Sequence, residues 1–196
     1  MQPPVAGFLC GTDDPAPIRN LSLTAGAAMS FYDSLRRGSV LAIEIERKFL
    51  VRGNAWKQEA DTGRFMTQAY VFSNGDRSAR VRITDKSAKL TIKFGSGSMS
   101  RTEFEYQIPY DDAVEMTAKA QGRVIEKTRY EVVHEDFVWE VDVFHGPLEG
   151  LVLAEVELRS EDDKPSLPSW VGREVTGDAH YYNTSLARHG LPDLVV

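Results

Sequence analysis

Cysteine is almost absent from the sequence, which has a single one, Cys10, among 196 residues. One cysteine cannot form a disulfide within the chain, so the composition excludes a disulfide-stabilised scaffold and favours a reducing, cytoplasmic location. No apolar run approaches the about 20 residues that a helix needs to span a bilayer, so no membrane helix is expected. The GxxxxGK[ST] phosphate loop and the GxSxG nucleophile motif are missing too.

An excess of positive charge is also lacking. The chain has 23 Lys and Arg against 29 Asp and Glu, for a formal net charge of −6. Proteins that bind nucleic acid usually carry a basic excess or a basic stripe, whereas acids and bases are intermixed here. The charge therefore argues against a nucleic-acid partner. It still allows a small anion held in a local basic pocket, together with a metal.

Regular patterning begins only at Leu41. Residues 1–39 have no sustained hydrophobic period and contain several Gly and Ser residues, with prolines at Pro3, Pro4, Pro15 and Pro17. This composition is typical of a disordered leader. We therefore expect residues 1–39 to be disordered and residues 40–196 to form one domain.

The patterned part of the chain alternates apolar and polar residues with a period of two, which is the strand signal. Two further segments have helical spacing, 109–121 and 180–189, and each is followed by a glycine stop. Together they predict an α+β fold. The predicted strands are 41–51, 65–72, 78–84, 88–94, 101–108, 123–134, 137–144 and 151–159.

The polar faces of these strands carry an unusual arrangement of charge. Charges of the same sign recur two residues apart, about 7 Å along one strand face, where they repel. Carboxylate pairs suit divalent cations such as Mg²⁺ or Mn²⁺, and pairs of Arg or Lys suit phosphate oxygens. The acidic positions are Glu44, Glu46, Glu103, Glu105, Glu140, Asp142, Glu155 and Glu157, and the basic ones are Arg80, Arg82, Lys127 and Arg129.

A solvated sheet face can carry the same pattern, because acids and bases on neighbouring strands can pair at modest gain. A barrel with charged residues inside and apolar residues outside, covered by helices, accounts for the pattern equally well. The alternation alone leaves both interpretations open.

The order of the motifs resembles the CYTH superfamily, the triphosphate tunnel metalloenzymes, and in particular its short bacterial members similar to inorganic triphosphatases. Glu44, Glu46 and Lys48 resemble the ExExK signature that opens the family. The resemblance covers about residues 42–190. It continues through QAY at 68–70, RVR at 80–82, LTIK at 90–93, RTEFE at 101–105, EKTRY at 126–130, EVDVF at 140–144, LAEVE at 153–157, WVGREVT at 170–176 and YYN at 181–183.

The resemblance implies a closed eight-stranded antiparallel β-barrel with flanking helices, whose interior is a tunnel. It implies divalent-metal-dependent hydrolysis of a small triphosphate, foremost inorganic triphosphate to pyrophosphate and phosphate, with Mg²⁺ or Mn²⁺ as cofactor. A class IV-type adenylyl cyclase, a thiamine triphosphatase and a non-catalytic binder of triphosphate or polyphosphate are the alternatives. A homodimer is compatible with an apolar barrel exterior.

The resemblance and the charge pattern together suggest roles for individual residues. Lys48, Lys127 and Tyr70 are the candidates for proton transfer, although a phenol with an ordinary pKa near 10 is a poor base at neutral pH. The family usually has arginine where this chain has His180, and a neutral imidazole binds phosphate less strongly. The expected phosphate-binding residues are Lys48, Arg80, Arg82, Lys93, Lys127 and Arg129. The expected metal ligands are Glu44, Glu46, Glu155 and Glu157, with Glu103, Glu105 and Asp142 as further ligands or supporting groups.

Overall fold

The computed structural model of the protein describes residues 42–85, 87–95 and 100–192. The predicted leader, residues 1–39, lies outside the described residues, so that prediction is untested. Within the described ranges, neither α-helix has the length and apolar character needed to cross a membrane.

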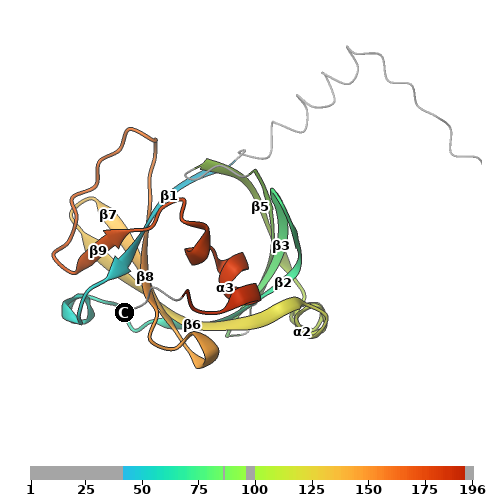
Figure 1. Ribbon diagram of the computed structural model, residues 1–196. Helices are drawn as coiled ribbons and strands as arrows, with labels where there is room; N and C mark the ends of the chain where they lie inside the picture. Colours follow the sequence, from blue (N-terminus) through green and yellow to red (C-terminus); the bar gives the residue numbers. More distant parts are fainter. Residues whose placement is uncertain (1–41, 86, 96–99, 193–196) are drawn as a thin grey trace, which may run out of the picture. The chain divides into compact units, whose positions relative to one another are not determined.

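The described part of the chain contains nine strands and two α-helices (Figure 1). Eight of the strands match the predicted ones, and both predicted helices are present but shorter. The strands are β1 (Ala42–Val51), β2 (Arg64–Asn74), β3 (Arg77–Thr84), β4 (Ser87–Phe94), β5 (Ser100–Ile108), β6 (Gln121–His134), β7 (Phe137–Phe144), β8 (Val152–Glu157) and β9 (Val171–Glu174). The helices are α2 (Tyr110–Ala118) and α3 (Asn183–His189), with short 3₁₀ turns η1 (Ala55–Gln58), η2 (Gly146–Leu148) and η3 (Ala179–Tyr181).

All strand pairs in the described sheet are antiparallel, in the order β5-β4-β3-β2-β6-β7-β8-β1-β9, and β1 pairs with β5 as well. Different parts of β1 pair with different strands. Residues 42–45 pair with β5, and residues 46–50 pair with β8. Figure 1 shows the sheet strongly curved, with α3 on its inner side.

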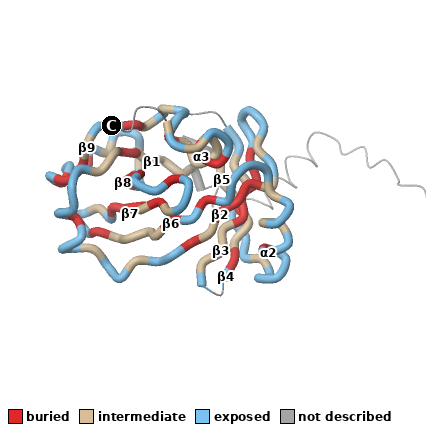
Figure 2. Tube along the Cα trace, turned by 60° about the horizontal axis from the view of Figure 1, so that its bottom comes forward, coloured by how far each residue is buried: buried red, intermediate tan, exposed pale blue. Residues whose placement is uncertain are grey.

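The main apolar core lies on the sheet face opposite the charged residues. Trp139 and Val156 point to this face from β7 and β8, and they pack with Trp56 of η1 and with Trp170. Figure 2 shows buried positions interspersed with more exposed ones along β7. Because the strands bury their apolar side chains outward, their charged side chains are left to face one another across the inside of the curve.

A second core cluster lies at the inner side, where α3 meets the sheet. Leu186 and Ala187 of α3 are buried against Tyr70, Ile125 and Leu153. This packing fixes the C-terminal segment of the described chain beside the charged faces of the strands.

Candidate active site

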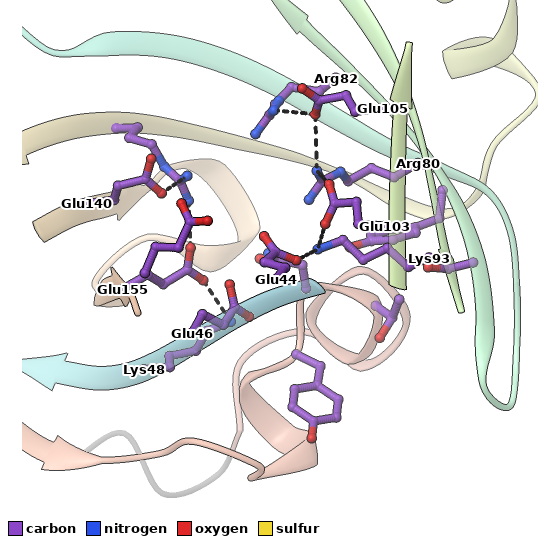
Figure 3. Close-up of a pocket in the computed structure, with 17 residues that line it drawn as sticks. Glu44, Glu46, Lys48, Arg80, Arg82, Lys93, Glu103, Glu105, Glu140 and Glu155 are labelled. Carbon is purple, nitrogen blue, oxygen red and sulfur yellow. Dashed lines mark hydrogen bonds and ion pairs between the residues drawn. The ribbon is translucent and has the colours of Figure 1, made fainter. Parts of the chain in front are cut away.

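A cavity of about 250 Å³ lies among the charged faces of the strands. Figure 3 shows side chains from opposite parts of the sheet pointing into it. Residues far apart in sequence that were predicted from strand alternation and the family resemblance together therefore share one interior space. The predicted site residues that line it are Glu44, Glu46, Lys48, Tyr70, Arg80, Arg82, Lys93, Glu103, Glu105, Arg129, Glu155 and Glu157.

Glu155 is held between two cations on one side of the cavity. Lys48 Nζ lies 2.8 Å from Glu155 Oε1 (Figure 3). Arg129 Nη2 lies 2.8 Å from Glu155 Oε2. Lys48 and Glu155 are directly opposite in the β1–β8 register. Burial raises the pKa of Glu155, but the charges of Lys48 and Arg129 outweigh burial and hold the pKa well below its usual value. Glu155 is thus ionised at neutral pH.

Lys93 bridges two carboxylates on the other side of the cavity. Its Nζ lies 2.7 Å from Glu44 Oε2 and 2.6 Å from Glu103 Oε2. Burial raises the pKa of Glu44, and the neighbouring Glu103 raises it further. Burial raises the pKa of Glu103 also, but its hydrogen bond with Glu44 and the charge of Lys93 bring it below the usual value. Arg80, whose Nη2 lies 3.6 Å from Glu103 Oε1, adds a second positive charge beside this pair.

Two arginines lie one above the other on β3. Arg82 Nη2 is 2.8 Å from Glu105 Oε2, and Arg80 Nη2 is 3.6 Å from Glu103 Oε1. Burial lowers the pKa of Arg82, and so does the charge of Arg80. A guanidinium nevertheless stays protonated in proteins, so both groups present fixed positive charge and forked donors to the cavity.

Lys127 and Asp142 were predicted as site residues, but they do not line the cavity. They lie behind Arg129, each with a side chain that is 1% exposed, and Lys127 Nζ is 2.5 Å from Asp142 Oδ2. Arg129 Nε and Nη2 also donate to the two Asp142 oxygens, at 2.7 and 2.6 Å. Burial lowers the pKa of Lys127 to about 8. The buried Lys127–Asp142 pair therefore fixes the position of the Arg129 guanidinium on the side away from the cavity.

Replacing Lys127 by methionine should reduce the rise in the free energy of unfolding that occurs between about pH 8 and pH 10.5. The pKa of Lys127 is about 8 when folded, against 10.5 as its ordinary value, so the unfolded chain binds more protons between these values. Stability therefore rises with pH in this window in the wild type, by about 3 kcal/mol from this group. Urea unfolding at pH 7 and pH 10 should show the wild type gaining on the variant. An equal pH response of both proteins would contradict the assignment.

The chemistry of the carboxylates fits Mg²⁺ or Mn²⁺, which prefer oxygen ligands. Glu46 and Glu157 are directly opposite each other in the β1–β8 register, and both line the cavity. Like charges placed opposite in a sheet are destabilising, and a divalent cation between them would offset the repulsion. In the described ranges, no three His, Cys, Asp or Glu side chains are already grouped to hold a metal. Metal binding would thus require carboxylates to exchange lysine or arginine partners for the ion.

The cavity has lining residues that the sequence did not single out as site residues. Glu140 was part of the charge pattern, and its alternation with apolar neighbours is the signal that could have included it. Residues 182–184 come from the start of α3, where no strand period exists to indicate their direction. The additional lining residues are Ser78, Glu140, Tyr182, Asn183 and Thr184.

His180 lies away from the cavity. Its side chain is 71% exposed, and its Nδ1 is 2.8 Å from Asp178 Oδ1. Its imidazole therefore does not replace the family arginine at the site.

The fold and the charged cavity agree with the similarity to known proteins. The CYTH domain matches residues 42–191, and the chain belongs to this family. An inorganic triphosphatase of Acetivibrio thermocellus is 46% identical over 147 residues, which cover 74% of this chain and 94% of that protein. An inorganic triphosphatase of Nitrosomonas europaea is 37% identical over 150 residues, covering 74% and 96%. A solved structure of an inorganic triphosphatase is similar with a TM-score of 0.54 and 34% identity, covering 76% of this chain and 97% of that one.

Proposed function

We propose that the protein hydrolyses inorganic triphosphate to pyrophosphate and phosphate in this cavity, with a divalent cation. The observation that carries the proposal is that one small interior space is lined by several lysines and arginines and by several carboxylates. A chain of phosphates needs the first set, and the cation that accompanies it needs the second. The named activity of the relatives supports the same reaction.

We also propose that β1 to β8 form a closed barrel, so that the cavity is part of a tunnel. The pairing of β1 with β5, the strand at the far end of the sheet order, supports closure. In such a barrel the charged faces are held at fixed separations. The side chains are therefore preorganised, and little free energy is needed to rearrange them when the substrate binds.

The size of the cavity supports a small substrate. Pockets for drug-sized ligands span about 300–1,000 Å³, and this one has about 250 Å³. An inorganic chain of three phosphates suits this space better than a nucleotide, whose base and sugar would have to lie outside the cavity. The cyclase alternative is therefore the weaker one.

The lining residues divide into two groups in the proposed mechanism. Lys48, Arg80, Arg82, Lys93 and Arg129 bind phosphate oxygens and neutralise the charge that develops as the phosphorus–oxygen bond breaks. Bound Mg²⁺ or Mn²⁺ supplies polarisation of the phosphate and activation of the attacking water. The proposed metal ligands are Glu44, Glu46, Glu155 and Glu157, with Glu103 and Glu105 as further oxygen donors.

Substrate and cation should bind cooperatively. The substrate takes lysine and arginine away from their carboxylates, and the cation then compensates the charge of those carboxylates. The anion takes hydrogen bonds that Lys93 and Arg129 now give to carboxylates, and those carboxylates are left needing positive charge. A divalent cation supplies that charge. Lys127 and Asp142 hold Arg129 in place while its partners in the cavity change.

A substrate panel tests the proposed function. Purified protein is incubated with inorganic triphosphate, ATP or thiamine triphosphate, with Mg²⁺ or Mn²⁺. Phosphate release from inorganic triphosphate should exceed that from ATP or thiamine triphosphate by about 100-fold or more. The cavity has room for three phosphates but not for a base and sugar or for thiamine. EDTA should abolish the phosphate release. Cyclic AMP formed from ATP, or tight binding of triphosphate without turnover, would overturn the proposal.

We make three further proposals about the protein as a whole. They are a domain comprising residues 40–196, a cytoplasmic location and a homodimer. Sedimentation at micromolar concentration would decide the last of these.

A further inference from the structure

Gln68 is a buried amide beside the cavity that the proposed mechanism does not use. It lies on the inner face of β2, opposite Arg82 of β3 and Ile125 of β6, and is 1% exposed. Its Nε2 donates a hydrogen bond of 3.2 Å to Oη of Tyr70, two residues along the same face. Tyr70 lines the cavity and is 6% exposed.

Packing does not explain an amide at this position. Within the described part of the chain, Gln68 Oε1 is buried and has no hydrogen-bond partner. Such an unsatisfied group costs about 1–3 kcal/mol, and a leucine or methionine of similar volume would avoid that cost. Residues that break a packing rule without structural compensation tend to mark functional sites. Among the described residues, the side chain of Gln68 makes one hydrogen bond, to Tyr70, and the value of the amide therefore lies in that bond.

That bond determines what the phenol of Tyr70 can do. An N–H directed at Oη occupies a lone pair and withdraws electron density, so the hydroxyl becomes a weaker proton acceptor and a stronger hydrogen-bond donor. Phosphate oxygens are hydrogen-bond acceptors. Tyr70 lies directly opposite Arg80 in the β2–β3 register, and Arg80 is one of the proposed phosphate-binding residues.

We propose that Gln68 is a positioning residue that sets Tyr70 to donate its hydroxyl hydrogen to a phosphate oxygen of the substrate, and not to accept a proton from the attacking water. The inference rests on the proposed triphosphatase function. It assigns Tyr70 to the stabilisation of negative charge, alongside Arg80. It also explains why a buried polar side chain is kept next to an apolar cluster.

Two substitutions of Gln68 separate this role from simple packing. Gln68→Leu removes the donor and should lower kcat by about tenfold with KM changed less than about twofold, because a transition-state hydrogen bond is weakened. Gln68→Glu places an acceptor beside Tyr70 when ionised, which turns the hydroxyl away from the cavity. Its kcat should lie below that of Gln68→Leu at pH 8. The buried carboxyl protonates as the pH falls and can donate again, so its kcat relative to Gln68→Leu should rise toward pH 6. A ratio independent of pH would overturn the proposal.

A double-mutant cycle with Tyr70→Phe gives a second, independent test. Once the hydroxyl is gone, Gln68→Leu should have no further effect on kcat. Effects that simply multiply would overturn the proposal, and this cycle decides the matter if Gln68→Glu does not fold. Gln58→Leu, an exposed glutamine in η1, is the matched control and should leave kcat unchanged. A wild type with no activity on triphosphate would defeat the proposed function itself, whereas an active wild type without coupling defeats only this inference.

Discussion

Replacing Glu157 by glutamine is expected to lower metal-dependent turnover of triphosphate by about 100-fold or more, because a neutral amide replaces one charged oxygen ligand of the cation. Glu157 lines the cavity directly opposite Glu46, yet it is exposed, so its loss should leave the fold intact. The measurements are initial rates over a titration of Mg²⁺, and calorimetric binding of Mn²⁺ to the protein without substrate.

Both measurements should change together, with weaker Mn²⁺ binding accompanying the lower rate. Glu44→Gln, on the opposite side of the cavity beside Lys93, should behave alike. Glu161→Gln is the matched control, since Glu161 lies in an exposed turn outside the cavity. Unchanged turnover and unchanged Mn²⁺ binding in both cavity variants would remove the metal assignment.

The second large effect is on stability. Asp142→Asn should destabilise the protein by about 3–5 kcal/mol, because it leaves Lys127 and Arg129 buried without the carboxylate that both of them contact. Denaturant unfolding at pH 7 measures the change in the free energy of unfolding. Turnover should fall as well, since asparagine offers one acceptor oxygen in place of two and Arg129 loses one of its two hydrogen bonds to residue 142.

A matched control and a rescue sharpen this prediction. Asp162→Asn, in an exposed turn, should change stability by less than about 0.5 kcal/mol. Replacing Asp142 and Lys127 together by leucine should recover part of the loss, because no charge of that pair is then buried alone. If Asp142→Asn were no more destabilising than the surface control, the buried cluster would not be a support for Arg129.

Alternation of polar and apolar residues was enough to predict the strands. All eight of these strands begin and end within two residues of the predicted limits. The period of two is strong there because one face of each strand packs into a core and the other faces charge. β9 was missed because four residues, one of them Gly172, are too few to establish a period.

The same pattern could say which residues share a face, but not how deep each one lies. Lys127 and Arg129 are two residues apart on one face of β6 and looked equivalent in sequence. In the fold, Arg129 lines the cavity while Lys127 is sealed behind it beside Asp142. Depth depends on strand register and curvature, which are set by pairing between distant segments. Residues 182–184 were not predicted as site residues for a related reason, which is that only the docking of α3 brings them to the cavity.

The pairing of β1 has a consequence for how the protein is made. β1 is the first described strand to be synthesised, and its neighbours β8 and β9 are among the last. A ribosome-bound chain must therefore carry one edge of β1 unpaired until β8 has been synthesised, and an unpaired strand edge can associate with other chains. Because α3 also contributes to the cavity wall, a nascent chain has no complete pocket until α3 has left the ribosome and docked on the sheet.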